Sequence, residues 1–184
     1  DPATGTPRQL EIHVRGDMNQ ARPRMVEVPA QGLLNPSLSP TGVRALFEHR
    51  GEILTVPAEE GDWRNLTGSS STAERAPAWA PDGRQIAWFS DEGGEYGLMI
   101  GSQDGLTEPR RIELPEPSFY FRPTWSPDSR RIAFTDTHYR IWMVDVASGD
   151  ATVVDTDRFA HPERTMNPVW SPDSRWIAYS RRLD

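Results

Sequence analysis

Residues 122–129 read Arg122-Pro123-Thr124-Trp125-Ser126-Pro127-Asp128-Ser129, and three other stretches of the chain follow the same pattern. They are Asn35-Pro36-Ser37-Leu38-Ser39-Pro40-Thr41-Gly42, Ala76-Pro77-Ala78-Trp79-Ala80-Pro81-Asp82-Gly83 and Asn167-Pro168-Val169-Trp170-Ser171-Pro172-Asp173-Ser174. The second proline of the pattern falls at positions 40, 81, 127 and 172, so the spacings are 41, 46 and 45 residues. A repeat of roughly 40–45 residues is typical of the four-stranded blades of a β-propeller.

The repeated residues suit two strands that a tight turn connects. A large apolar residue ends the first strand, where it can pack against a neighbouring sheet: Trp79, Trp125 and Trp170, with Leu38 in the first copy. The proline presets the backbone of the turn and the acid that follows caps it: Pro40, Pro81, Pro127 and Pro172, then Asp82, Asp128 and Asp173. Apolar second strands follow at 45–47, 86–89, 132–134 and 177–179. We interpret the repeated residues as structural.

Further apolar segments predict a third and a fourth strand in each repeat, and no segment has the periodicity of a helix. We therefore predict an all-β chain, a β-propeller with four-stranded antiparallel blades. Complete blades are expected at 35–67, 76–114 and 122–156, and a half blade at 167–184, within a partial propeller over 33–184. Residues 1–32 are expected to end a preceding blade and to lead into this propeller, with strands at 9–15 and 25–28. The N-terminal strands could complete the half blade and close a small ring, or the chain could belong to a larger ring.

The composition excludes several classes of protein. The 184 residues, 36% of them apolar, are enough for one domain of ordinary size. The net charge of −7 disfavours nucleic acid as a partner, because binding to a polyanion needs a basic surface. The absence of cysteine excludes disulfides and thiolate sites, and no apolar run approaches the ~18 residues of a membrane-spanning helix. No metal and no cofactor are expected, because the histidines share no ligand spacing: His13, His49, His138 and His161.

The unit Trp170-Ser171-Pro172-Asp173-Ser174-Arg175-Trp176-Ile177-Ala178 resembles the blade repeat that TolB, tricorn-type and prolyl-oligopeptidase-type propellers share. A longer series of segments resembles the middle of bacterial tricorn-like proteases: Ser39 to Glu48, Arg50 to Pro57, Arg64 to Thr67, Ala80 to Asp91, Glu95-Tyr96 and Asp155 to Arg158. In that family two propellers precede a PDZ-like module and a serine-peptidase core. The passage from Arg8 to Val28 resembles the step from the first propeller into the second. By this resemblance the chain covers the end of the first propeller and the opening blades of the second.

The resemblance implies a non-catalytic part of a serine peptidase. Such a propeller would guide or filter peptide substrates toward a catalytic core outside this chain, so we expect no enzyme activity and no catalytic residue in the chain itself. No Gly-x-Ser-x-Gly elbow occurs, and Ser126 and Ser171 alternate with Ala80 in the same slot, which indicates a structural role. One alternative is a stand-alone TolB-like protein-interaction propeller. A weaker alternative is the propeller of a prolyl-oligopeptidase-like enzyme.

Candidate binding residues lie in the loops and not in the repeated turns. The connections between blades, and those between second and third strands, differ in length and sequence among the repeats, and variable loops on a rigid scaffold commonly carry binding. Some of them combine aromatic rings with arginines, which could hold peptide backbone or a terminal carboxylate. The candidates for peptide or partner binding are Arg75, Phe119, Tyr120, Arg122, Arg158, Phe159, His161 and Arg164. The alternative is that these aromatic residues pack between blades.

The expected partners follow from the same resemblance. They are peptides or unfolded protein substrates and the remainder of the parent peptidase, with self-association through open blade edges as a further alternative. No nucleic acid and no membrane span are expected. Because the chain starts at Asp1 and not at a methionine, we expect a piece of a longer bacterial protein, and the compartment stays open between cytoplasm and periplasm.

Overall fold

The computed structural model of the chain describes residues 5, 12–13, 16, 26–158 and 166–181. Strands in this part form three four-stranded sheets and one two-stranded sheet, which we call blades 1 to 4. Blade 1 holds β1 (Leu34–Leu38), β2 (Arg44–His49), β3 (Glu52–Pro57) and β4 (Arg64–Asn65). Blade 2 holds β5 (Glu74–Trp79), β6 (Gln85–Ser90), β7 (Gly97–Ser102) and β8 (Arg110–Ile112). Blade 3 holds β9 (Tyr120–Trp125), β10 (Arg131–Asp136), β11 (Arg140–Asp145) and β12 (Ala151–Thr156), and blade 4 holds β13 (Val169–Trp170) and β14 (Ile177–Ala178).

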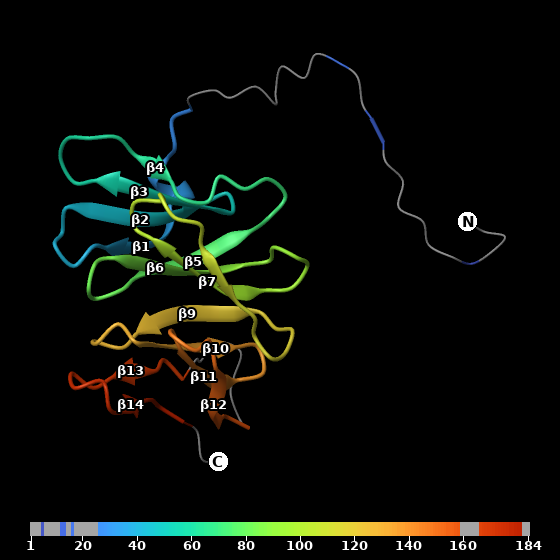
Figure 1. Ribbon diagram of the computed structural model, residues 1–184, viewed down its shortest axis with the longest axis vertical. Helices are drawn as coiled ribbons and strands as arrows, with labels where there is room; N and C mark the ends of the chain where they lie inside the picture. Colours follow the sequence, from blue (N-terminus) through green and yellow to red (C-terminus); the bar gives the residue numbers. More distant parts are fainter. Residues whose placement is uncertain (1–4, 6–11, 14–15, 17–25, 159–165, 182–184) are drawn as a thin grey trace.

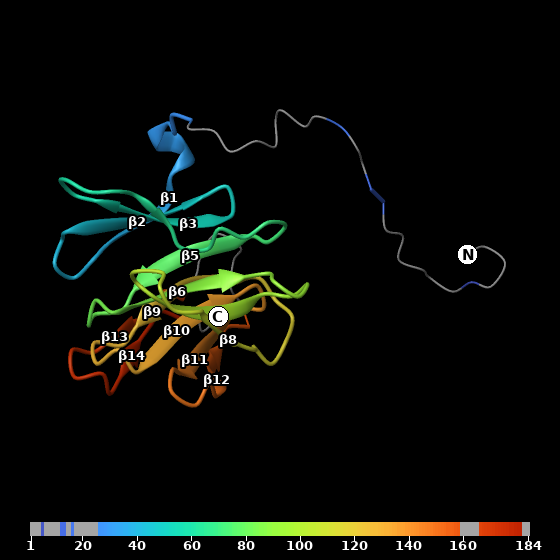
Figure 2. The same cartoon turned by 45° about the horizontal axis from the view of Figure 1, so that its top comes forward.

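The blades follow one another in sequence order, as Figures 1 and 2 show. Within each blade, consecutive strands pair antiparallel. The first strands of consecutive blades contact each other, β1 with β5, β5 with β9 and β9 with β13. First strands are therefore innermost, and the prediction of an all-β fold with four-stranded antiparallel sheets is confirmed.

The N-terminal segment differs from the prediction. Residues 26–28, part of the strand expected at 25–28, lie outside any strand, and Val26 is exposed. Pro29 follows, which cannot donate a ladder hydrogen bond, and a short 3-10 helix, η2 (Ala30–Gly32), leads into β1. Of the strand expected at 9–15, Ile12 and His13 are in no strand, and the rest lies outside the described residues.

Two apolar clusters fill the spaces between complete blades. Between blades 1 and 2, Leu46 and Ile53 pack against a set from blade 2: Trp79, Ile86, Trp88 and Met99. Between blades 2 and 3, three rings meet edge to face or stacked, with Phe89 5.5 Å from Tyr120 and 5.3 Å from Phe134 between centroids. Blades 2 and 3 each bury one face against the blade before, so the core lies between blades and not within one.

A tryptophan side chain connects the inner strand of one blade to that of the blade before. The Nε1 of Trp125 donates to the Ala78 carbonyl at 3.1 Å, and the Nε1 of Trp170 donates to the Thr124 carbonyl at 3.0 Å. The counterpart between blades 1 and 2 differs, because the buried Nε1 of Trp79 has no hydrogen-bond partner among the described residues. The first interface therefore lacks the tryptophan hydrogen bond that the next two have.

The repeated turn also connects blades. Within it, the Ser126 hydroxyl donates to Asp128 Oδ1 at 2.6 Å and accepts from the Arg131 amide at 2.9 Å. The serine that ends the turn reaches the preceding blade, since Ser129 Oγ accepts from the Asp82 amide at 3.1 Å and Ser174 Oγ accepts from the Asp128 amide at 3.0 Å. One short motif thus closes a hairpin and connects two sheets.

A bulge recurs on the inner strands. The residue before the first proline of each repeat has a left-handed φ, between 42° and 52°: Asn35, Ala76, Arg122 and Asn167. The pairing register shifts at this point in the sheets of blades 1, 2 and 3. In β5 the bulge lies directly after Arg75, at the strand end that carries the loops described below.

Replacing each buried indole by a phenyl ring tests the interblade hydrogen bond. We expect Trp125→Phe to lower the free energy of unfolding by about 1–2 kcal/mol more than Trp79→Phe, because only the first change removes a hydrogen bond, whereas the second removes a buried N–H that has no acceptor. Urea unfolding followed by circular dichroism measures both. Equal losses would contradict this role of Trp125.

The turn carboxylates predict a loss of stability in acid. The Ser126 hydroxyl holds the pKa of Asp128 below its ordinary 3.8, and the Ser171 hydroxyl does the same for Asp173. A lowered folded-state pKa adds stability above the unfolded pKa, and this stability disappears as the pH falls through the folded value. We expect Ser126→Ala to reduce the loss of stability between about pH 6 and about pH 2, with Ser171→Ala acting in the same direction. Urea midpoints across that range measure it, and an unchanged pH dependence in both variants would refute the explanation.

Candidate functional site

The variable loops gather at one edge of the sheets, which we call the loop face. In an antiparallel blade the start of the first strand, the turn between the second and third, and the end of the fourth share an edge. Hydrogen bonds join these loops, from the Thr137 amide to the Phe119 carbonyl at 3.1 Å and from the Glu74 amide to the Gly51 carbonyl at 2.9 Å. The repeated proline turns occupy the opposite edge, which we call the turn face.

The predicted binding residues divide into several groups. Arg75 and Phe119 meet on the loop face between blades 2 and 3. Tyr120 does not belong to that surface, because its ring is fully buried between the same blades, as the packing alternative expected. Arg122 is exposed, and its Nη1 donates to Asn167 Oδ1 at 2.9 Å, toward blade 4. Arg158 is exposed after β12, while Phe159, His161 and Arg164 lie outside the described residues.

The Arg75 cluster consists of Arg75, Tyr96, Phe119 and Phe121. The guanidinium carbon lies 3.5 Å from the ring centroid of Phe119, 5.5 Å from that of Tyr96 and 5.6 Å from that of Phe121. Phe119 also meets the other two rings edge to face. The cation therefore lies among aromatic rings, an arrangement that their π electrons stabilise.

Arg75 is only half covered. Its Nη1 donates to the Tyr120 carbonyl at 2.8 Å, and partial burial lowers its pKa from the ordinary value, an effect that Tyr96 and Glu48 oppose. Phe119 is 39% exposed, so one side of the cluster faces solvent. An exposed aromatic ring beside an arginine is the composition of many binding hot spots.

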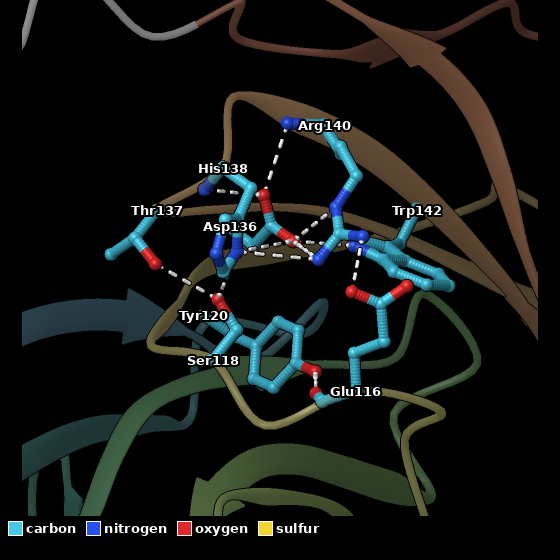
Figure 3. Close-up of polar contacts among 8 residues, drawn as sticks. All are labelled: Glu116, Ser118, Tyr120, Asp136, Thr137, His138, Arg140 and Trp142. Atoms are coloured by element: carbon cyan, nitrogen blue, oxygen red, sulfur yellow. Dashed lines mark hydrogen bonds and ion pairs between the residues drawn. The ribbon is translucent and has the colours of Figure 1, made fainter.

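A second group of polar side chains surrounds Asp136 at the turn between β10 and β11, as Figure 3 shows. The Asp136 side chain is fully buried. Its Oδ1 accepts from the amides of His138 and Arg140 at 2.9 and 3.0 Å. Its Oδ2 accepts from Arg140 Nε at 2.8 Å and from Trp142 Nε1 at 2.9 Å, and it lies 2.7 Å from Arg140 Nη2. With five donors around it, this carboxylate has no acceptor site left for a substrate proton.

Arg140 connects Asp136 to the segment before β9. Its Nη1 lies 2.7 Å from Glu116 Oε2, and its guanidinium lies over the Trp142 ring at 4.8 Å. Burial alone would lower the pKa of Arg140, but the hydrogen bonds to both carboxylates raise it overall. Tyr120 donates its hydroxyl to the Glu116 carbonyl, and burial, with the nearby charge of Asp136, raises the pKa of Tyr120 to about 12. These contacts hold the segment between blades 2 and 3 against the turn between β10 and β11.

In blade 2, other side chains hold the corresponding turn between the second and third strands. Ser90 occupies the position of Asp136 and accepts from the Glu92 amide at 3.2 Å, while its hydroxyl donates to Glu74 Oε1 at 3.4 Å. Glu74 stands where blade 3 has Tyr120, and the Ser69 hydroxyl is within 2.9 Å of both of its oxygens. The corner of each blade is thus held by different polar residues.

Sequence reasoning missed Asp136, Arg140 and Trp142 because it looked for residues that the repeats share, and the other copies have different residues at these positions. One signal was present, an acid two residues after the apolar strand at 132–134 with an arginine four residues later. The repeated serines offer no nucleophile, since the Ser126 hydroxyl is buried and bonded within its turn. Among the described residues no group of three or more His, Asp or Glu side chains is placed to hold a metal ion. In the same part of the chain, no helix has the length and apolar character to cross a membrane.

Comparison with curated proteins finds short matches to TolB. No family model matches the chain. The Tol-Pal system protein TolB of Methylobacillus flagellatus is 30% identical over 73 residues, which cover 38% of this chain and 16% of that protein. The protein of the same name from Nitrosomonas europaea is 39% identical over 51 residues, or 28% of this chain and 12% of that protein. The matched segments are thus a small part of both relatives.

Solved structures share the fold over most of the chain. A putative TolB from Agrobacterium tumefaciens has a TM-score of 0.62 and 24% identity, covering 80% of this chain and 53% of that one. TolB from Acinetobacter baumannii has a TM-score of 0.62 and 22% identity, covering 82% and 38%. An oligogalacturonate lyase in complex with manganese has a TM-score of 0.65 and 16% identity, covering 81% and 45%. The chain spans about half or less of these structures, and its fold is that of a TolB-like β-propeller.

Removal of the Asp136 carboxylate tests its structural role. We expect Asp136→Ala to lower the free energy of unfolding by about 3–5 kcal/mol, because Arg140 and the Trp142 N–H then lose a buried acceptor. The matched control is Asp145→Ala at the other end of β11, where the carboxylate accepts from the exposed turn amides of Ala147 and Ser148 and the loss should be much smaller. If Asp136→Ala does not fold, Asp136→Asn should still lose more than the control. Urea unfolding measures the three variants, and equal losses would contradict the assignment.

Proposed function

We propose that this chain is part of a TolB-like interaction propeller that binds a partner protein through its loop face. The observation that carries the proposal is the Arg75 cluster, where a half-covered guanidinium and the 39% exposed ring of Phe119 lie together on variable loops. Interfaces concentrate their binding free energy in aromatic residues and arginines placed in this way. Because both curated relatives are named Tol-Pal system proteins, components of such a system are the first partners to test.

The turn face fits a scaffold and not a binding surface. Its serine and aspartate side chains bond to each other and to neighbouring blades, so their polar atoms already have partners. The loop face differs, since its side chains change from blade to blade. Variation on one edge of a rigid repeat is the usual basis of specific binding.

The resemblance to tricorn-like proteases supports a second candidate. In that case the chain would be a non-catalytic portion of a serine peptidase, and the loop face would guide or filter peptides. The segments quoted from Ser39 to Arg158 support this candidate, whereas the relatives and structures reported above are TolB proteins and a lyase. The gene sequence downstream separates the two: a PDZ-like module and a peptidase region favour the second candidate, and a stop codon within one blade removes it.

Self-association through the end blades also stays a proposal. Leu38 of blade 1 is 70% exposed, whereas its counterpart Trp79 is covered by the preceding blade and is 8% exposed. Val169 of blade 4 is exposed as well. Either a second copy or further blades of the same protein could cover these apolar faces. Light scattering on the purified chain tests the first option, and a monomer at all concentrations would contradict it.

Site-specific photo-cross-linking tests the proposed function. A photoreactive phenylalanine analogue replaces Phe119 on the loop face, or Asp173 on the turn face as the matched control, in the bacterium that encodes the protein. We expect one recurrent partner protein to cross-link from position 119 and none from position 173, because the turn face is already bonded within the fold. Cross-linking from position 173 alone, or none from position 119, would refute the proposal.

A further inference from the structure

Arg75 has hydrogen-bonding capacity that the fold does not use. Of its five N–H donors, only Nη1 has an acceptor in the described part of the chain, the Tyr120 carbonyl. Arg140 on the next blade shows the contrast, since Asp136 and Glu116 both bind its guanidinium. Arg75 therefore presents a half-buried positive charge with free donors on its remaining edge.

The neighbouring carboxylates do not neutralise this charge directly. Glu48 Oε2 accepts from the Ala76 amide at 2.9 Å and from Asn35 Nδ2 at 2.7 Å. Glu74 is bound by the Ser69 hydroxyl. Neither acid forms an ion pair with Arg75 within 4.0 Å in the described structure, although Glu48 is close enough to raise its pKa. Carboxylates thus lie near Arg75, but their oxygens accept hydrogen bonds from other groups.

The rings around Arg75 limit what can reach it. Phe119 covers one flat side of the guanidinium at 3.5 Å, so a ligand must approach the edge, where a carboxylate can accept two parallel hydrogen bonds. Tyr96 stands at this site with a hydroxyl that has no hydrogen-bond partner among the described residues. Burial raises the pKa of Tyr96, so at neutral pH the hydroxyl carries its proton and can donate. The exposed side of Phe119 offers an apolar surface next to the charge.

The charges around Arg75 favour a singly charged anion. One cation balances one negative charge, and the adjacent Glu48 together with the net charge of −7 repels a doubly charged phosphate. A singly charged carboxylate fits this balance. An aromatic or aliphatic group beside the carboxylate would cover Phe119 and remove apolar surface from water.

We propose that the Arg75 cluster binds a carboxylate that a partner peptide carries next to an apolar side chain, with Arg75 Nε and Nη2 and the Tyr96 hydroxyl as donors and Phe119 as the apolar wall. The inference rests on the proposed function, because it takes the partner to be a polypeptide. A C-terminal carboxylate and a glutamate side chain share this chemistry, and the experiment separates them.

Fluorescence anisotropy with labelled peptides tests the site on the full chain. The probes are a short Gly/Ser peptide that ends in phenylalanine with a free carboxylate, the same peptide with a C-terminal amide, and an amidated peptide with glutamate beside the phenylalanine. We expect at least one carboxylate peptide to bind about tenfold or more tightly than the plain amide, since a charge-assisted bidentate pair has a strength of this order. The peptide that binds identifies the source of the carboxylate.

Variants locate the effect. Arg75→Met should abolish the preference for the carboxylate, and Arg75→Lys should reduce it, because lysine lacks the planar fork that stacks on Phe119. Phe119→Leu should weaken binding of both kinds of peptide, and because the ring is 39% exposed the variant is expected to fold. Arg84→Met is the matched control, an exposed arginine on the turn face of the same blade whose loss should leave binding unchanged. Thermal unfolding confirms that each variant is folded.

The inference would be overturned by equal binding of all three peptides, or by a carboxylate preference that survives Arg75→Met. Tighter binding of an oligogalacturonate than of any peptide would also overturn it, in favour of a carbohydrate ligand. The proposed function is tested separately. If position 119 still cross-links a partner when Arg75 is methionine, the loop face is an interface that does not depend on this carboxylate site.

Discussion

The apolar face of each blade is buried only when another blade lies against it. A single antiparallel sheet has no core, so Leu46 and Ile53 are fully buried by residues of blade 2, and Phe89 by rings of blade 3. Stability is therefore distributed over interfaces between neighbours, as in other repeat proteins. Positions without a neighbour stay exposed, as Leu38 does in blade 1.

The three interfaces between blades differ in the hydrogen bonds that accompany this apolar packing. Trp125 and Trp170 add a hydrogen bond to the preceding inner strand, and Ser129 and Ser174 add another at the turn face. Blade 2 has Gly83 in place of those serines, and its Trp79 N–H has no acceptor within the described chain. The first interface lacks these two hydrogen bonds and has others, because the amides of Ala76 and Glu74 donate to Glu48 Oε2 and to the Gly51 carbonyl.

The loop face does not follow the repeat, and its polar residues differ from blade to blade. Arg140 forms ion pairs with Asp136 and with Glu116, so these charged side chains are part of the scaffold. Arg75 keeps free donors and lies among rings that are partly exposed. The difference between a saturated and an unsaturated arginine, which lie on neighbouring blades, separates the structural network from the candidate binding site.

The amino-acid sequence by itself determined the blade. The blade follows from local patterns: the spacing of the prolines, the tryptophan at the end of the first strand and the apolar second strand. Such patterns can be predicted from the sequence because strand and turn propensities act over a few residues. Only the tertiary structure decided what the aromatic residues do. Phe119, Tyr120 and Phe121 are consecutive, yet the alternation of a strand and the following bulge bury Tyr120 and leave Phe119 beside Arg75, which comes from the preceding blade. That contact joins residues more than forty positions apart, and it depends on the stacking of two sheets, which no short pattern encodes.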